Sequence, residues 1–259
     1  SMDSAKRQQQ ADFVAALLAA LGPKDRFNLA VCDVDCQWLH EKLISPDAAG
    51  IDKARAWLES RMSLAWTDLD LMAESVLKQL GQHTQVIYVG DGIITARSAD
   101  PQAFANRLKR LTDKQTGGTF HAVSVGNTFE STVLQALARV GGGSLRQIGG
   151  EQTPQKTAFE LLNEIAQPGL KNLKVEFRGL QVAAVYPDQL PNLSAGTQQI
   201  LIGRYLPQGK DQTGEIIITG ERNGEPVRFA SRVSLADAES GNSFIPRLWA
   251  RAHLDHLPG

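Results

Sequence analysis

Two residues of this sequence carry oxygen ligands at places where α/β proteins bind ligands. Asp91 lies between two glycines, directly after the short apolar run 86–89. Such a run, closed by glycine, is typical of a strand buried on both faces of a parallel sheet, and ligands bind at the carboxyl ends of these strands. Thr67 precedes the amphipathic segment 68–80, which places it in a second loop of the same kind. A carboxylate and a hydroxyl are hard oxygen ligands suited to Mg²⁺.

Both residues also have purely structural explanations. Aspartate beside glycine is ordinary turn chemistry, so Asp91 could simply order a turn. Thr67 followed by Asp70 has the spacing of a capping box, in which the hydroxyl caps the next helix. Two oxygen donors are too few to hold an octahedral ion, so the pair alone leaves both interpretations open.

Two other patterns could bind a cofactor or a metal. Gly90-x-Gly92 after a strand matches part of a dinucleotide-binding fingerprint, but the third glycine and the later acidic residue are absent. His253 and His256 lie three residues apart and would share one face of a helix, a spacing that can ligate a metal. Exposure on a terminal helix explains the two histidines more simply. The sequence contains no Walker loop, Gly-x-Ser-x-Gly or zincin motif.

The composition is that of a globular protein. The chain has 259 residues, of which 42% are hydrophobic and 21% charged, so one large or two small domains are expected. The net charge of −1 gives no indication of a nucleic-acid partner. No apolar run approaches the length of a membrane-spanning helix.

The two cysteines, Cys32 and Cys36, are predicted to be free thiols. On one continuous strand they would lie about 13 Å apart, which is too far for a disulfide. Only a hairpin turn between them would bring the sulfur atoms together.

The spacing of apolar residues predicts alternating helices and strands in the first two thirds of the chain. Helices are expected at 4–21, 50–62, 68–80, from 100, from 127 and from 153 to 167, and strands at 26–35, 84–89, 119–125 and 144–148. This alternation predicts an α/β fold with a mostly parallel, Rossmann-like sheet covered by helices on both faces.

After Pro168-Gly169 the apolar residues repeat every second position. About five antiparallel strands are expected near 173–177, 182–186, 200–202, 216–218 and 227–229, followed by a C-terminal helix that Ser243 caps. The predicted domains are therefore 1–167 and 168–259.

Several segments, in this order, resemble von Willebrand factor A domains, in particular the variant of inter-alpha-trypsin inhibitor heavy chains and their bacterial relatives. The similarity spans nearly the whole chain, and the order and spacing of the segments carry it. The segments are 22–31, 66–69 (Trp-Thr-Asp-Leu), 89–92 (Val-Gly-Asp-Gly), 140–143, 186–187 and 244–250.

The resemblance implies a protein-binding or adhesion module that is not an enzyme. Such a domain has a metal-ion-dependent adhesion site, in which Mg²⁺ or Ca²⁺ is completed by a carboxylate of the partner protein. Residue by residue, the resemblance assigns metal ligands to Thr67, to Asp91 and, as a third position, to Ser1. It also implies an extracellular or cell-envelope location.

The sequence departs from the family pattern in two places. Gly90 stands where the family usually has threonine, and the family's first strand, which ends in Asp-x-Ser-x-Ser, does not occur in these residues. Ser1 falls where the last serine of that motif would lie. The metal site is therefore expected to be incomplete and to bind no ion tightly, and the gap in the sheet to be filled by another segment or by self-association. The alternatives are a structural module without metal and a nucleotide-dependent enzyme that uses Gly90-Asp91-Gly92.

The dipeptide Asn223-Gly224 predicts a tight hairpin turn. A type I′ turn needs φ > 0 at both positions, which Asn-Gly tolerates and Ala-Ala does not. Replacing both residues by alanine should lower the free energy of unfolding by about 1–3 kcal/mol. Chemical denaturation measures this change, and an unchanged midpoint would mean that the turn is of another type.

Overall fold

The computed structural model divides the chain into two compact units, Ser1–Ala166 and Gln167–Gly259. The structure describes residues 4–33, 35–60, 68–81, 83–96, 99–112, 118–166, 169–188, 190, 192–193, 198–222, 225–235 and 244–254.

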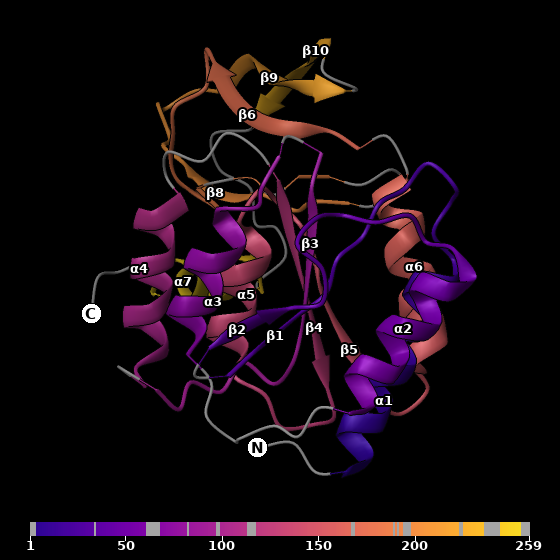
Figure 1. The fold of residues 1–259 in the computed structure, drawn as a ribbon. Helices are drawn as coiled ribbons and strands as arrows, with labels where there is room; N and C mark the ends of the chain where they lie inside the picture. The colour runs from indigo at the N-terminus through magenta and orange to yellow at the C-terminus, as the bar shows by residue number, and fades with distance from the viewer. Residues whose placement is uncertain are drawn as a thin grey trace. The chain divides into compact units, whose positions relative to one another are not determined.

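A parallel sheet forms the middle of the first unit. Its strands run in the order β3 (Gln85–Val89), β4 (Thr119–Val125) and β5 (Leu145–Ile148). Helices cover both faces, as Figure 1 shows: α1 (Ser4–Ala19), α2 (Ala48–Glu59) and α6 (Pro154–Ala166) lie on one side, and α3 (Leu69–Leu77), α4 (Pro101–Thr112) and α5 (Ser131–Arg139) lie on the other. The α/β fold predicted from the sequence is confirmed.

The sheet separates two apolar cores. All seven residues of β4 are buried, and its side chains alternate between the two sides. Phe120 and Ala122 pack in the core under α3, α4 and α5, whereas Val123 and Val125 pack in the core under α1 and α6. Burial on both faces is the reason why the strand reads as a continuous apolar segment.

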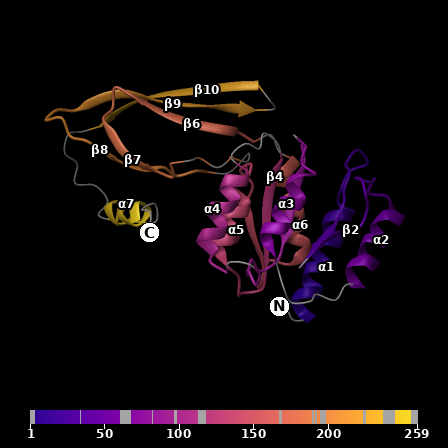
Figure 2. The same cartoon turned by 60° about the vertical axis from the view of Figure 1, so that its left-hand side comes forward.

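A two-stranded antiparallel hairpin continues this layer. It consists of β1 (Ala30–Cys32) and β2 (Cys36–Trp38), so the strand predicted at 26–35 is much shorter than expected. Cys32 and Trp38 contact the core under α3, while Leu29 and Leu39 contact the core under α1. The hairpin therefore shares both cores with the parallel sheet. Figure 2 shows the strands and helices of this unit from another side.

The hairpin and the parallel sheet are nevertheless separate in their backbone hydrogen bonding. Within the described part of the chain, β1 pairs only with β2, and β3 pairs only with β4. The N–H of Gly90 donates to Val123, and the carbonyl of Thr84 accepts from Thr119, so the even-numbered residues of this strand bond to β4. In a parallel ladder, the intervening residues then direct their backbone groups toward the opposite edge.

Those intervening residues are Gln85, Ile87 and Val89, and the described residues place no strand beside them. The carbonyl of Val89 accepts a hydrogen bond from the side-chain amide of Gln10 on α1, at 2.6 Å. On the hairpin, Ala30 and Cys32 lie at the positions that do not bond to β2. Among the described residues, no strand pairs with this edge of either piece.

The prediction of free thiols is wrong, because Cys32 and Cys36 form a disulfide. The chain turns back between them, so they sit opposite each other on β1 and β2 with Cα atoms 4.1 Å apart. The estimate of about 13 Å assumed a single extended strand, and this hairpin was the arrangement that would invalidate it.

The predicted cap of the helix after Thr67 also differs from the structure. Asp68, and not Thr67, caps α3, since its carboxylate accepts from the N–H of Leu71. Asp70 does not complete a capping box but forms two hydrogen bonds to Arg107 on α4. The carboxylate of Asp68, directly before the helix, takes the place of the cap that the sequence spacing suggested. The helix predicted from 127 begins at Ser131, with Glu130 as its N-cap.

The second unit is antiparallel. It contains one sheet in the order β10 (Glu225–Leu235), β9 (Gln212–Arg222), β6 (Lys171–Arg178), a hairpin of β7 (Val182–Tyr186) and β8 (Ile202–Tyr205), and the helix α7 (Ile245–Leu254). The five predicted strands and the final helix are present, although the strands form two sheets. Arg222 pairs with Glu225, so β9 and β10 make the expected hairpin. Asn223, Gly224 and Ser243 lie outside the described residues.

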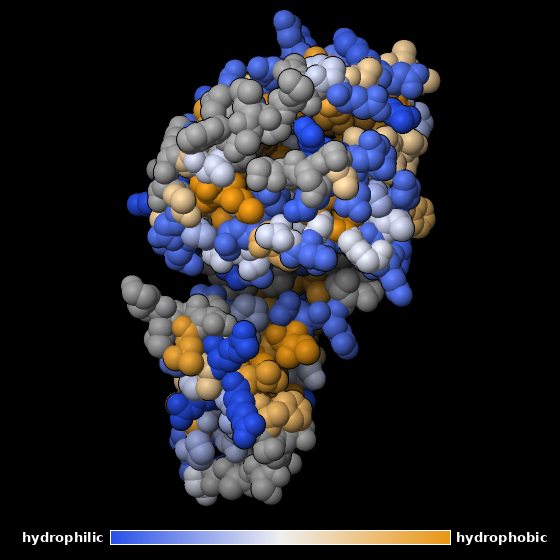
Figure 3. Space-filling view, turned by 90° about the horizontal axis from the view of Figure 1, so that it is seen from below, coloured by the Kyte–Doolittle hydropathy of each residue, from blue (hydrophilic) through white to orange (hydrophobic). Residues whose placement is uncertain are grey.

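The surface mixes polar and apolar side chains. On the face drawn in Figure 3, apolar patches lie among hydrophilic residues. The described helices include none that is long and apolar enough to cross a membrane.

The ion pair between Arg107 and Asp70 predicts a measurable loss of stability. The Asp70 side chain is 5% exposed, and both of its carboxylate oxygens accept from Arg107, at 2.8 and 2.9 Å. The substitution Arg107→Met would leave this buried carboxylate unpaired and should cost about 2–4 kcal/mol. Urea denaturation measures the change. Arg110→Met, on an exposed position of the same helix, is the matched control and should change stability little. Equal effects of the two substitutions would contradict the assignment.

Candidate functional site

Asp91 lies at the carboxyl end of β3, where the sequence places it. It is 9% exposed, and its Oδ1 accepts from the N–H of Ile93 at 3.1 Å. Its backbone carbonyl accepts from the N–H of Glu130, the N-cap residue of α5, at 2.8 Å. The carboxylate is thus held in a fixed place at the edge of the sheet, between the end of a strand and the start of a helix.

The glycines on either side of Asp91 are explained by packing. A Cβ at Gly90 would lie 2.5 Å from the hydroxyl oxygen of Tyr88, and a Cβ at Gly92 would lie 3.0 Å from Leu134. Gly92 also has φ +71°, a conformation that side chains disfavour. Burial of the hydroxyl, together with the nearby Asp91 carboxylate, raises the pKa of Tyr88 above its ordinary value.

This packing removes the main argument for a phosphate-binding loop. The N–H of Gly92 donates to the Tyr88 hydroxyl, and the N–H of Ile93 donates to Asp91, so both are used within the turn. A phosphate cradle requires backbone N–H groups directed at the ligand. The structure therefore gives the nucleotide-dependent alternative no support at Gly90-Asp91-Gly92.

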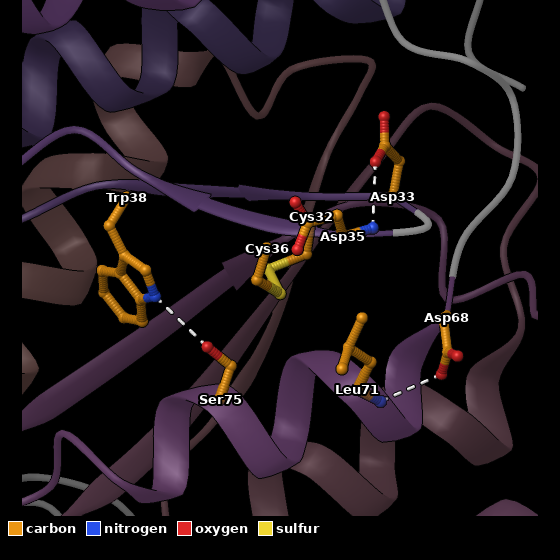
Figure 4. Close-up of a disulfide and its surroundings, with 8 residues drawn as sticks. All are labelled: Cys32, Asp33, Asp35, Cys36, Trp38, Asp68, Leu71 and Ser75. Atoms are coloured by element: carbon orange, nitrogen blue, oxygen red, sulfur yellow. Dashed lines mark hydrogen bonds between the residues drawn. A yellow bond between two sulfur atoms is a disulfide. The ribbon is translucent and has the colours of Figure 1, made fainter.

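The neighbouring loop is tied to the β1–β2 hairpin. The N–H of Asp68 donates to the carbonyl of Asp33 at 2.9 Å, and Asp68 is 9% exposed. Figure 4 shows the two residues beside the disulfide, with the Asp68 carboxylate directed at Leu71. Thr67 and Ser1, the other predicted metal ligands, lie outside the described residues, so the structure does not test whether the three positions meet.

The described residues do not by themselves make a metal site. Asp91 supplies one carboxylate, and one of its oxygens already accepts a backbone hydrogen bond. No group of three or more His, Cys, Asp or Glu side chains suited to a metal occurs among the residues that the structure describes. The donor type suits Mg²⁺ or Ca²⁺, but an ion would need further ligands.

Of the histidine pair near the C-terminus, the structure describes only His253. His253 Nδ1 is hydrogen-bonded to the hydroxyl of Tyr186, and its ring stacks on Trp249 with centroids 4.8 Å apart. The Trp249 indole donates to the carbonyl of Ala184 at 2.8 Å. These contacts attach α7 to the β7–β8 hairpin. His256 lies outside the described residues.

Two features were not predicted from the sequence: the hydrogen bond from Asp68 to Asp33 and the disulfide beside it. The cysteine spacing was a usable signal, because four residues is a spacing that a tight hairpin can bridge. The bond to Asp68 joins segments 35 residues apart, and no local pattern indicates it.

A helix-covered parallel sheet with a carboxylate at its edge defines a Rossmann-like α/β domain. The family model of the von Willebrand factor type A domain matches residues 1–147, which is more than half of the chain. The chain belongs to this family, whose members are typically protein-interaction modules.

Curated relatives match over nearly the whole chain. Inter-alpha-trypsin inhibitor heavy chain H4 of Homo sapiens is 23% identical over 278 residues, which cover 99% of this chain and 29% of that protein. Heavy chain H6 of Homo sapiens is also 23% identical, over 99% of this chain and 21% of that protein. The chain thus spans less than a third of the length of these relatives.

Solved structures share the fold. A von Willebrand factor type A protein from Catenulispora acidiphila aligns with a TM-score of 0.62 at 12% identity, over 90% of this chain and 62% of that one. The ArnB paralog VWA2 from Sulfolobus acidocaldarius aligns with a TM-score of 0.52 at 14% identity, over 95% of this chain and 67% of that one.

Replacing Gly92 by alanine should lower stability for two reasons, the clash of the new Cβ and the positive φ. A matched substitution separates the two contributions. Gly92 and Gly150 both have positive φ, but a Cβ at Gly150 would have nothing within 4 Å, whereas one at Gly92 would press on Leu134 and Glu130. The substitution Gly92→Ala should therefore destabilise the protein by about 1–3 kcal/mol more than Gly150→Ala. Thermal and urea denaturation of both variants measure the difference, and equal losses would mean that the turn relaxes without strain.

Proposed function

We propose that this chain is a protein-binding or adhesion module whose binding surface is the sheet edge around Asp91. Membership of the von Willebrand factor A family supports a binding role, and the observation that carries the assignment is the fixed position of Asp91. Its carboxylate is held by the N–H of Ile93, and its carbonyl by Glu130, so it needs little reorganisation to meet a ligand. The module has no catalytic role.

In the complete site, Thr67 and Asp91 would coordinate Mg²⁺ or Ca²⁺, with Ser1 as a third ligand. The ion would supply a positive charge that a carboxylate of the partner protein binds. Asp91 is the one predicted ligand among the described residues, and a Mg²⁺ site usually takes one or two carboxylates together with several waters. The chain by itself is therefore expected to bind the ion weakly.

A further extended segment would complete the layer between β1 and β3. No strand among the described residues pairs with the facing edges of β1 and β3, and side chains of both pieces already enter the same two cores. A strand placed between them would need apolar side chains on both faces, because helices cover both sides of the sheet. Another segment or a second copy of the chain would provide it, the latter by self-association.

The disulfide supports an extracellular or cell-envelope location. Disulfides persist in oxidising environments and are rare in the cytosol, and both cysteines of this chain are paired. The second candidate function is a structural module that binds no metal. Asp91 is the one predicted metal ligand among the described residues, which favours this alternative, and metal titration separates it from the first.

Fusing an additional strand to the chain tests both the proposed metal site and the proposal that a strand is missing between β1 and β3. An apolar strand that ends in Asp-x-Ser-x, fused directly before Ser1, would complete the motif Asp-x-Ser-x-Ser. Isothermal titration should show no tight Mg²⁺ binding by the original chain and clear binding by the fusion, with the fusion's binding lost on Asp91→Asn. The asparagine keeps an oxygen for the N–H of Ile93 while removing the charge, so the turn should persist.

A second fusion, whose added Asp and Ser residues are replaced by alanine, is the matched control. It should raise the melting temperature as the first fusion does, because it restores the same backbone hydrogen bonds, yet it should bind no Mg²⁺. If the original chain bound Mg²⁺ with micromolar affinity and Asp91→Asn abolished this binding, the proposal that the site is incomplete would be wrong. Equal melting temperatures of the original chain and both fusions would contradict the proposal that a strand is missing between β1 and β3.

A further inference from the structure

The disulfide lies at the point where the β1–β2 hairpin turns. Cys32 and Cys36 are opposite residues of the two strands, at a pair that does not exchange backbone hydrogen bonds. Side chains approach each other most closely at such pairs, which suits a cross-strand bridge. Both cysteines are only partly buried, and they also contact the core under α3.

The same turn holds the residue that begins α3. The carbonyl of Asp33, next to Cys32, accepts from the N–H of Asp68 at 2.9 Å. The carboxylate of Asp68 in turn accepts from the N–H of Leu71 at 2.9 Å (Figure 4). Asp68 is therefore fixed from two sides, and its covalent neighbour in the sequence is Thr67.

The rest of the hairpin is held by side-chain packing in the two cores, and its own strands are short. Each strand has three residues, and one edge of β1 is open within the described part of the chain. A two-stranded hairpin of this size is only marginally stable by itself. A further attachment to α3 is the hydrogen bond from the Trp38 indole to the Ser75 hydroxyl, at 3.2 Å, and the cysteines and Trp38 also pack against the core under this helix. The disulfide closes the turn covalently and restricts it in addition to these contacts.

We infer that the Cys32–Cys36 disulfide is a redox modification site that controls the position of Asp68. A dithiol reductant is its reaction partner. In the reduced protein, the turn at Asp33 loosens and the hydrogen bond to Asp68 opens. The further consequence, that reduction weakens binding at the sheet edge, rests on the proposed function.

The reductant cleaves the disulfide by thiol–disulfide exchange in two steps. A thiolate of the reductant attacks one cysteine sulfur, the disulfide bond breaks, and the other cysteine leaves as a thiolate that takes up a proton. The second thiolate of the reductant then displaces the first cysteine from the mixed disulfide, and that cysteine also takes up a proton. The reductant leaves as its own disulfide, and the two electrons reside on Cys32 and Cys36.

Amide hydrogen exchange measured by NMR tests the inference on the intact chain. Reduction with dithiothreitol should accelerate exchange at the Asp68 N–H by about tenfold or more, and re-oxidation should reverse the change. The N–H of Ala122, which donates to Ser144 in the middle of the sheet, is the internal control and should stay protected. The double substitution Cys32→Ser and Cys36→Ser should show fast exchange at Asp68 with and without dithiothreitol.

Two results would overturn the inference. One is unchanged exchange at Asp68 when thiol titration shows both cysteines reduced. The other is loss of protection at Ala122 as well, in the reduced protein or the double variant, because the disulfide would then stabilise the whole unit and not a local contact.

A separate measurement addresses the functional consequence. Reduction should weaken Mg²⁺ binding by the fusion that carries Asp-x-Ser-x before Ser1, and unchanged affinity would show that the site is insensitive to the disulfide. If the fusion binds no Mg²⁺ in either redox state, the proposed metal site fails, while the exchange at Asp68 still decides the redox inference.

Discussion

Burial of side chains on both faces of one strand layer is the constraint on which the first unit depends. Helices cover the layer on both sides, so β4 carries apolar residues in both directions, such as Phe120 toward α4 and Val123 toward α1. The β1–β2 hairpin obeys the same constraint, with Trp38 on one side and Leu29 on the other. The two pieces are therefore joined through their cores. Between β1 and β3, the described residues supply no backbone ladder, and unpaired backbone groups cost about 1–3 kcal/mol each where water cannot reach them.

The same packing fixes the geometry of the candidate site. Tyr88 fills the space that a side chain at Gly90 would need, and Leu134 fills the space beside Gly92. The turn is therefore tight, and Asp91 stands at its tip with its carboxylate and its carbonyl both hydrogen-bonded. Because these glycines are required by packing, they carry no information about a nucleotide. What remains for function is one well-ordered carboxylate at the edge of a parallel sheet, the place where such sheets bind ligands.

The β1–β2 hairpin connects the Cys32–Cys36 disulfide to the start of α3. Asp33 lies beside the disulfide, and its carbonyl holds Asp68 at the start of α3. The disulfide, which closes a turn of five residues, is thereby connected to Asp68, a residue that is distant in sequence and adjacent in space. The link depends on the tight turn, since a longer connection between β1 and β2 would separate the sulfur atoms from the contact with α3.

The sequence by itself determined the order of the elements and most of their positions. Strand β4 occupies the predicted residues 119–125, and the change of apolar period after Pro168 marked the antiparallel strands. These features depend on the local spacing of apolar residues, which can be seen directly in the sequence. The position of Asp91 followed for the same reason, because a buried strand that ends in glycine has to turn there.

Only the tertiary structure decided the contacts between distant segments. It paired Asp70 with Arg107 and not with the helix start, made Asp68 the cap in place of Thr67, and joined Cys32 to Cys36. Local spacing predicted otherwise in each case, because spacing along a helix or strand carries no information about which side chain a neighbouring element brings. The edges of β1 and β3 with which no described strand pairs likewise emerged only when the strands were paired, since hydrogen bonding between strands is a property of the whole sheet.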